Sequence, residues 1–296
     1  MLAIVGTVPD PDFGLEEASV TLDDDHLFFR GKKVVINRGT PALVAAAAKA
    51  CAVLDLPPPV VLLVGDIGRG DGSQRLYEYL TRHLGNRKYR VMTFHYLQPD
   101  VDWHNRVLFA LEEMKVRPTL IADAGFMYAA KMSGQAPSFD LFTPDVGELA
   151  FLADEDAPHP FYTRGFILHE EYKVPDLIAR AFQNDNAARH LLVKGQRDYV
   201  ADLQGIQVTI GDCPEEAMEA IGGTGDTLTG IVSALVAADL EIIDAAALAA
   251  RVNRLSGYYA HPTPATQVMD IIHQIPRALK ELLGGRTETS DRQCAS

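Results

Sequence analysis

The stretch Ile221–Gly230, IGGTGDTLTG, joins a glycine-rich turn to the start of a helix and carries one carboxylate, Asp226. Three glycines in four positions allow positive φ values and let the backbone approach a bulky anion closely. The helix that follows adds unpaired N–H groups and the positive end of its dipole. The stretch therefore predicts an anion-binding turn made by four residues: Gly222, Gly223, Thr224 and Gly225.

Asp226 lies at the mouth of this turn, where a phosphate would repel it unless the site uses the carboxylate as a base or through a metal. We interpret Asp226 as the catalytic base for an attacking hydroxyl. The structural alternative is that the glycines only ease a tight turn and that Asp226 stabilises the helix dipole as a first-turn acid. The rest of the chain has to decide between these interpretations.

The composition is that of an ordinary globular protein, with 296 residues of which 47% are hydrophobic. We see no linker and no internal repeat, so we expect one domain over residues 1–296, with a disordered polar tail at about 285–296. The net charge of −13 argues against nucleic acid or an anionic membrane as the main partner. We expect a nucleotide and a small molecule as ligands, and self-association into a homo-oligomer is left open.

The start of the chain lacks a basic leader region, and no apolar run approaches the roughly 20 residues that span a bilayer. The three cysteines have no metal-ligand spacing, and their odd number fits a reducing compartment better than a disulfide framework. We therefore expect a cytoplasmic protein.

Short apolar runs rich in β-branched residues alternate with longer helical stretches, which is typical of a mostly parallel sheet covered by helices. The fold class we expect is α/β, with an antiparallel hairpin at one sheet edge made by residues 199–202 and 207–210. A helix should begin at Thr40 as its N-cap, and the last helix should be interrupted near Pro276. The strands are expected at residues 33–37, 59–64, 89–95, 118–122, 141–143 and 191–194. The helices are expected near residues 40–54, 76–80, 107–114, 176–182, 224–238, 244–259 and 268–283.

In an open α/β sheet, ligands bind beyond the carboxyl ends of the strands. Residues 65–72, GDIGRGDG, follow one strand, and there Gly65, Asp66 and Gly68 could bring N–H groups to a phosphate or substrate, or simply form a flexible loop. Asp123 lies at the end of another strand, where it could contact a ligand or serve as the N-cap of the next helix.

Two further strand ends carry candidate residues. In residues 143–150, TPDVGELA, Asp145 and Glu148 fit a helix N-cap and its N3 partner, and Glu148 could also orient a metal-bound water. Lys194 and Gly195 follow the next strand, where a lysine can meet a nucleotide phosphate, although surface lysines are common. The chain has no dinucleotide fingerprint, no P-loop motif and no histidine pair at metal spacing.

Taken in order, these stretches resemble the ribokinase-like superfamily, and most of all its ADP- or ATP-dependent NAD(P)H-hydrate dehydratases, from Lys33 to Leu283. The most specific element is GGTGD at residues 222–226, because sugar kinases of the superfamily usually have Gly-Ala-Gly-Asp there. TPDVGE at residues 143–148 is similar to the family's Thr-Pro-His-Pro-Gly-Glu, and LVKG at residues 192–195 is similar to Val-Leu-Lys-Gly.

The resemblance implies a three-layer α/β/α sandwich and a nucleotide, ATP or ADP, lying against Lys194, Gly195 and the glycine turn. It also implies Asp226 as the base facing the transferred phosphoryl group and Mg²⁺ bridging the phosphates. In the dehydratases the substrate hydroxyl is phosphorylated and phosphate is then eliminated.

The chain departs from the family on the substrate side. Asp145 and Val146 replace His-Pro, and residues 37–40, NRGT, stand where the family has a longer glycine- and serine-rich loop. We therefore keep a kinase for a sugar or other small hydroxylated metabolite as an alternative, and a catalytically lapsed nucleotide-binding protein as a third. The substrate-side candidates are Gly65, Asp66, Gly68, Asp123, Asp145 and Asn37.

Overall fold

The computed structural model describes residues 1–155, 173–263 and 265–284. The chain divides into two compact units: unit 1 comprises Met1–Glu17 and Val61–Thr209, and unit 2 comprises Ala18–Val60 and Ile210–Ser296. A single domain over the whole chain stays a prediction, and the tail expected at 285–296 lies outside the described residues.

Unit 1 is built on a sheet that confirms the predicted fold class. Within the described residues, nine strands occur in the order β12-β11-β10-β9-β8-β7-β1-β6-β2. Pairing is parallel from β1 through β7, β8 and β9 to β10, and antiparallel between β10 and β11, so the predicted hairpin lies at one edge. The strands are β1 (Leu2–Val8), β2 (Glu16–Ser19), β6 (Val60–Gly65), β7 (Val91–His95), β8 (Thr119–Ala122), β9 (Leu141–Phe142), β10 (His190–Val193), β11 (Asp198–Asp202) and β12 (Gly205–Ile210).

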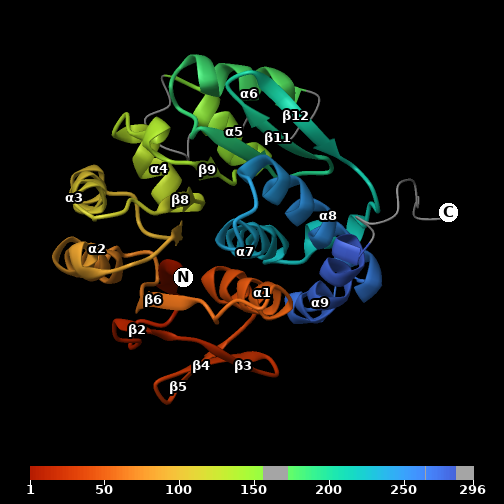
Figure 1. The fold of residues 1–296 in the computed structure, drawn as a ribbon, viewed down its shortest axis with the longest axis horizontal. Coiled ribbons are helices and arrows are strands. Elements are labelled where there is room, and N and C mark those ends of the chain that lie inside the picture. The colour runs from red at the N-terminus through yellow and green to blue at the C-terminus, as the bar shows by residue number, and fades with distance from the viewer. Residues whose placement is uncertain (156–172, 264, 285–296) are drawn as a thin grey trace. The chain divides into compact units, whose positions relative to one another are not determined.

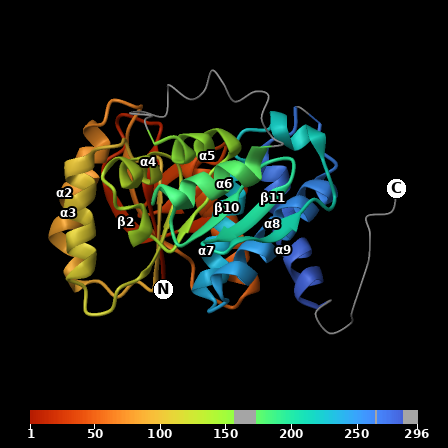
Figure 2. The same ribbon diagram turned by 90° about the horizontal axis from the view of Figure 1, so that it is seen from above.

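The central strands β1 and β7 are buried at every residue, as continuous apolar runs in a parallel sheet require. Helix α2 packs against α3, and Figures 1 and 2 show the two helices side by side. They are α2 (Asp71–His83), α3 (Val101–Glu112), α4 (Ala124–Met132), α5 (Val146–Ala153) and α6 (Val174–Gln183).

Unit 2 combines a helical cluster with a small sheet. Helix α1 packs on α7 and α9, and α8 packs on α7 and α9 (Figure 1). The approach of α1 to α7 is close, because a Cβ added at Gly230 would lie 2.2 Å from the carbonyl oxygen of Leu43. The elements are α1 (Thr40–Val53), α7 (Thr224–Ala237), α8 (Ile242–Ala260), α9 (Val268–Gly284) and the antiparallel strands β3 (Thr21–Asp23), β4 (His26–Phe29) and β5 (Lys32–Val35).

Several local predictions need correction. The N-cap of α1 is Gly39, not Thr40, and Thr40 is already helical. Helix α9 continues through Pro276 without a break, whereas an interruption was predicted. Residues 33–37 were predicted as a strand of the mostly parallel sheet, but β5 belongs to the small antiparallel sheet. Strand β1, which lies between β7 and β6, was not predicted at all.

The cysteines also differ from expectation. Cys51 is a buried free thiol, and burial raises its pKa to about 11. Cys213 is disulfide-bonded, whereas the odd number of cysteines was taken to fit a reducing compartment better than a disulfide framework. Among the described residues, none of the helices combines the length and the hydrophobicity that crossing a bilayer requires.

Candidate functional site

The predicted glycine turn forms the start of α7 in unit 2. Gly223 is the N-cap with a left-handed φ of 104°, and Thr224 is the first helical residue. A side chain at position 223 would be crowded as well as strained, because its Cβ would lie 3.0 Å from Cγ2 of Val268 and 3.2 Å from Cα of Arg38. Among the described residues, none accepts a hydrogen bond from the backbone N–H groups of Gly222, Gly223 or Gly225. The turn therefore has the donors that an anion site needs.

Asp226 is held in position by a second segment of the same unit. It is the third residue of α7, half-buried, and its Oδ2 accepts a hydrogen bond from the N–H of Gly39 at 2.6 Å. Gly39 is the N-cap of α1, so the loop before α1 and the turn before α7 meet at this carboxylate. Both interpretations of Asp226 agree with its place in the first helical turn, but the contact with Gly39 fixes the orientation of the carboxylate.

Asn253 on α8 supports the first turn of α7, and the sequence analysis missed it. Its Oδ1 accepts a hydrogen bond from the Thr227 hydroxyl at 2.6 Å, and its Nδ2 donates to the carbonyl of Thr224 at 3.1 Å. Asn253 is buried, and both contacts join residues far apart in the sequence. No local pattern marks such a residue, since only the packing of α8 on α7 brings it there.

The loop after β6 in unit 1 is organised around Asp66. Oδ1 of Asp66 accepts hydrogen bonds from the N–H groups of Gly68, Arg69 and Gly70 at 2.9 to 3.1 Å. Oδ2 accepts two more from Ser73, one from the backbone and one from the hydroxyl. Burial opposes ionisation, but these hydrogen bonds hold the pKa of Asp66 below its ordinary value. The donors predicted for a phosphate or substrate are therefore already used: the N–H of Gly68 by Asp66, and those of Gly65 and Asp66 by the carbonyl groups of Phe13 and Val8.

Gly65 is required by packing. A Cβ at this position would lie 1.9 Å from the carbonyl oxygen of Asp10 and 2.7 Å from that of Phe13. The glycine lets β6 end directly against the loop that follows β1. This contact explains the residue without a ligand.

Asp123 and Lys194 form an ion pair in unit 1. Nζ of Lys194 lies 2.9 Å from Oδ2 of Asp123, and Nε2 of His95 lies 3.9 Å from the same oxygen. Asp123 is also the N-cap of α4, where its Oδ1 accepts the N–H of Ala124. Asp123 therefore serves as the predicted N-cap, and its other oxygen is paired with Lys194, so the interpretation as a ligand group also stays open.

Gly195 and the helix after β9 complete the predicted set. The N–H of Gly195 donates to Oδ1 of Asp198 at 3.2 Å. Asp145 and Glu148 form the predicted capping box: the N–H of Glu148 donates to Asp145, and the N–H of Asp145 donates to Oε2 of Glu148. Oε1 of Glu148 accepts the Tyr128 hydroxyl at 2.8 Å. Burial, with the negative charges of Asp145 and Asp123, raises the pKa of Glu148 to about 8.

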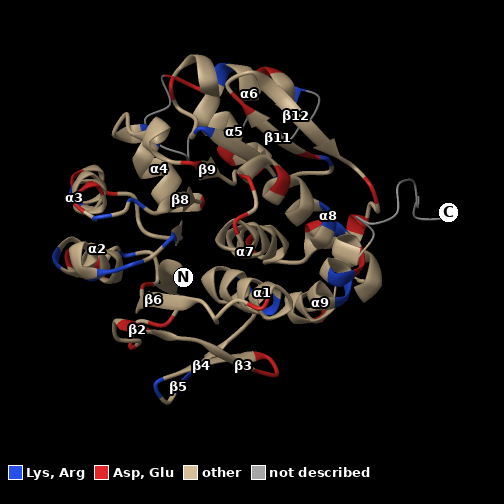
Figure 3. Ribbon diagram, viewed as in Figure 1, with Lys and Arg blue, Asp and Glu red and all other residues tan. Residues whose placement is uncertain are grey.

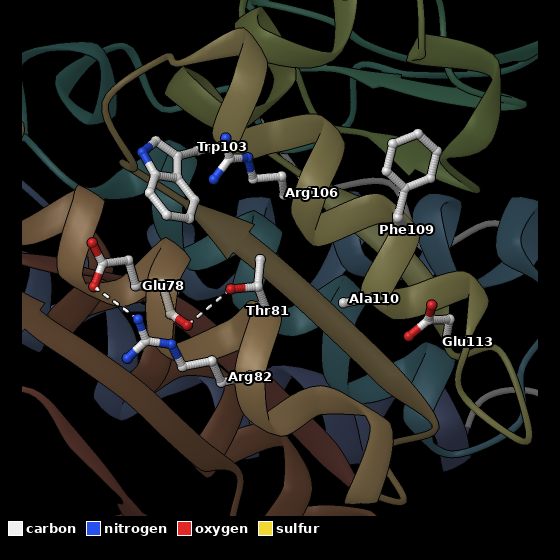
Figure 4. A pocket seen from close by; sticks show the side chains of 8 residues that line it. All are labelled: Glu78, Thr81, Arg82, Trp103, Arg106, Phe109, Ala110 and Glu113. Atoms are coloured by element: carbon white, nitrogen blue, oxygen red, sulfur yellow. Dashed lines mark hydrogen bonds and ion pairs between the residues drawn. The ribbon is translucent and has the colours of Figure 1, made fainter.

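A pocket of about 350 Å³ lies between α2 and α3, and Figure 4 shows its lining side chains. Figure 3 shows basic and acidic positions along both helices, and Glu78 and Arg82 form an ion pair at 3.8 Å. The described residues that line it include none of the predicted site residues: Glu78, Thr81, Arg82, Trp103, Arg106, Phe109, Ala110 and Glu113. It therefore does not guide the assignment of the site.

The chain has relatives of known family. The Carb_kinase family model, described as NAD(P)H-hydrate dehydratase, matches residues 98–277. An uncharacterised protein of Methanocaldococcus jannaschii is 40% identical over 242 residues, which are 81% of this chain and 100% of that protein. An ADP-dependent (S)-NAD(P)H-hydrate dehydratase of Cenarchaeum symbiosum is 28% identical over 176 residues, which are 59% of this chain and 55% of that protein.

Solved structures agree on the fold. A ribokinase-like superfamily protein from Enterococcus faecalis V583 has a TM-score of 0.58 at 15% identity, covering 95% of this chain and 86% of that one. At this identity the likeness speaks for the fold alone. The family model spans more than half of the chain. The chain therefore belongs to the NAD(P)H-hydrate dehydratase family of carbohydrate kinase-like proteins, and its fold is ribokinase-like.

Proposed function

We propose that the protein is an ADP- or ATP-dependent dehydratase that converts NAD(P)H hydrate back to NAD(P)H. The observation that carries the proposal is the glycine turn before α7, whose N–H groups at Gly222, Gly223 and Gly225 have no acceptor among the described residues. Beside it, Asp226 is oriented by the N–H of Gly39. A rigid set of donors next to a fixed carboxylate suits phosphoryl transfer, which depends on positioning and on stabilising charge.

In this proposal Asp226 takes the proton of the substrate hydroxyl. The hydroxyl oxygen then bonds to the terminal phosphorus of the nucleotide, whose bridging P–O bond breaks to release ADP from ATP, or AMP from ADP. The N–H groups of the turn stabilise the charge on the transferred phosphoryl group. Phosphate then leaves the substrate with the C–O bonding electrons, a proton is lost from the neighbouring ring carbon, and the ring double bond returns.

Mg²⁺ would supply neutralising charge on the nucleotide phosphates. Glu148 fits an indirect part in holding it, because each of its carboxylate oxygens already accepts a hydrogen bond within unit 1. A role in orienting metal-bound water leaves these contacts intact, whereas direct ligation would compete with them.

Lys194 and Gly195 remain our proposed nucleotide-binding residues in unit 1. The ammonium group of Lys194 is paired with Asp123, so contact with a phosphate would have to compete with that ion pair. On the substrate side we retain Asn37, Asp123, Asp145 and the loop residues Gly65, Asp66 and Gly68. Since Asp66 accepts the N–H groups of its loop, we expect that loop to meet a substrate through carbonyl groups or side chains rather than through an anion cradle.

A small-metabolite kinase is the second candidate, and Asp145 favours it. This residue is exposed and negatively charged, and it stands where the family has His-Pro. An exposed carboxylate accepts hydrogen bonds from the hydroxyl groups of a polyol, whereas it repels the phosphates of a dinucleotide.

The test incubates the full chain with Mg²⁺, hydrated NADH and either ADP or ATP, and follows the return of the near-ultraviolet absorbance of the reduced nicotinamide ring. Asp226→Asn is the test variant. Asp244→Asn is the matched control, because Asp244 is an exposed first-turn acid of α8 in the same unit. Recovery that needs both nucleotide and Asp226 supports the dehydratase.

Two other outcomes contradict it. A stable phosphorylated product from sugars or other hydroxylated metabolites, without recovery of NADH, assigns the kinase function. Nucleotide binding without turnover of any substrate, in the parent chain as in Asp226→Asn, assigns a catalytically lapsed nucleotide-binding protein.

A further inference from the structure

Arg38 lies directly against the glycine turn, although sequence reasoning gave it no role of its own. A Cβ built on Gly222 would lie 3.5 Å from Cδ of Arg38 and 3.7 Å from its Cβ, and one built on Gly223 would lie 3.2 Å from its Cα. The stem of Arg38 therefore covers the two glycines. The next residue, Gly39, donates the hydrogen bond to Asp226, so two consecutive residues contact the turn and its carboxylate.

The guanidinium group of Arg38 has no counter-charge within the described part of the chain. It is exposed, and no described residue forms a hydrogen bond, an ion pair or a ring contact with it. Other arginines are paired: Arg87 with Glu17, and Arg117 with Asp140. Arg75 and Arg251 likewise have no partner among the described residues, so what distinguishes Arg38 is its place against Gly222 and Gly223.

The turn itself needs a positive charge. Asp226 repels a phosphate bound at Gly222–Gly225, and the helix dipole offers only about half an elementary charge against it. A guanidinium group presents a planar fork of donors that matches two phosphate oxygens and stays charged at every working pH. It can offset the negative charge of the Asp226 carboxylate. Because it stays protonated, it does not compete with Asp226 for the proton of the substrate hydroxyl.

We propose that Arg38 binds the phosphoryl group held at the glycine turn and offsets the negative charge of Asp226. This inference rests on the proposed function, since it gives the phosphate site of that reaction its cation. It also assigns a purpose to the short loop at residues 37–40: in place of a longer glycine- and serine-rich loop, this chain brings an arginine to the turn.

The experiment measures two quantities for each protein: the dissociation constant of ADP with Mg²⁺ by calorimetry, and the kcat and KM of hydrate repair. The variants are Arg38→Gln and Arg38→Lys. The matched control is Arg251→Gln, because Arg251 is another exposed arginine of unit 2 with no partner among the described residues. Thermal unfolding checks that all four proteins are folded.

We expect Arg38→Gln to lower kcat by about 100-fold or more, as losses of arginine in phosphoryl transfer do, and to weaken ADP binding by about tenfold. Relative to Arg38→Gln, Arg38→Lys should restore ADP binding more than it restores kcat, because lysine supplies the positive charge but not the two parallel N–H donors of the guanidinium group. A merely structural role predicts loss of stability with equal effects of Gln and Lys. Wild-type values of binding and kcat in a folded Arg38→Gln would overturn the proposal.

The two readouts separate this proposal from the proposed function. If the parent chain repairs no hydrate but binds ADP, and Arg38→Gln weakens that binding while Arg251→Gln does not, the phosphate role of Arg38 stands and the assigned reaction fails. If the parent chain repairs hydrate and Arg38→Gln does so equally well, the reaction stands and Arg38 has no part in it. A parent chain that does not bind ADP overturns both.

Discussion

Two glycine-rich turns precede helices in this chain, and they differ in what their N–H groups contact. Residues 65–70 lead into α2 through the N-cap Gly70, with φ of 89°, and residues 221–223 lead into α7 through the N-cap Gly223, with φ of 104°. In the first, Asp66 precedes the cap and accepts the loop's own N–H groups. In the second, Asp226 follows the cap and contacts Gly39 instead.

We call the turn at residues 65–70 closed, because Asp66 accepts its N–H groups, and the turn at residues 221–223 open, because its N–H groups have no acceptor among the described residues. The two turns differ in whether the aspartate precedes or follows the N-cap. An aspartate ahead of the cap can fold back on the loop, as asparagine and aspartate commonly do in turns. Asp226, in the first helical turn, accepts the N–H of Gly39 and leaves the N–H groups of Gly222, Gly223 and Gly225 to a ligand. Glycine content alone does not distinguish the two cases.

The largest expected effect belongs to the open turn. Asp226→Asn should lower kcat of the proposed reaction by about 10² to 10⁴, because an amide cannot accept the hydroxyl proton. Binding of ADP should persist, since the N–H groups of the turn remain. Steady-state kinetics and calorimetry check this, with Asp244→Asn as the control. Undiminished kcat in Asp226→Asn would remove the carboxylate from the mechanism.

Removing the carboxylate of the closed turn should instead cost stability. Asp66→Ala leaves the N–H groups of Gly68, Arg69, Gly70 and Ser73 without their acceptor, so the free energy of unfolding should fall by about 2 to 3 kcal/mol in urea denaturation. The variant also turns a closed turn into an open one. Added inorganic phosphate should therefore raise the melting temperature of Asp66→Ala more than that of the parent chain. An equal rise in both proteins would contradict the comparison.

Alanine at the two N-cap glycines compares the turns directly. Gly223→Ala combines a left-handed φ with crowding at 3.0 to 3.2 Å, and should lower the free energy of unfolding by about 1 to 3 kcal/mol and weaken ADP binding. Gly70→Ala meets nothing closer than 3.9 Å, so only backbone strain of about 1 kcal/mol is expected, with ADP binding unchanged. Urea denaturation and calorimetry provide the values. If Gly70→Ala weakened ADP binding and Gly223→Ala did not, the phosphate would be bound at the turn before α2, which would contradict the account.

The smallest expected effect concerns how the free energy of unfolding changes at acidic pH. Because the pKa of Asp66 is lower in the folded state than its ordinary value of 3.8, the stability that its ionised form contributes is present above that value and is lost as the pH falls through the folded pKa. Asp66→Asn does not titrate, so its stability should fall less steeply over this acid range. Denaturation curves at a series of pH values compare the slopes. Identical slopes would mean that Asp66 is not specifically stabilised as a carboxylate.

The parallel strands were predictable because buried strands appear as unbroken apolar runs, and β6 to β10 were located in this way. Strand β1 is an equally clear run, LAIVGTV, but it was considered only as a leader segment. The capping box of Asp145 and Glu148 was predicted and confirmed, because its two residues are three positions apart and their contact is local.

Contacts between distant segments could not be predicted. The pair of Lys194 with Asp123 joins the ends of β10 and β8, and the support of α7 by Asn253 depends on how α8 packs. The contact of Gly39 with Asp226 joins residues 187 positions apart in the sequence. Helix α9 passes through Pro276 although local preference disfavours proline there, so tertiary packing of its apolar face outweighs a local penalty.

The most direct test of the open turn is the response of single backbone amides to nucleotide, followed by heteronuclear NMR during titration with ADP and Mg²⁺. The account predicts that the amide signals of Gly222, Gly223 and Gly225 shift in a saturable way, while those of Gly68 and Gly70, which already donate to Asp66, stay in place. Saturable shifts at Gly68 and Gly70 with unmoved signals at the turn before α7 would contradict it.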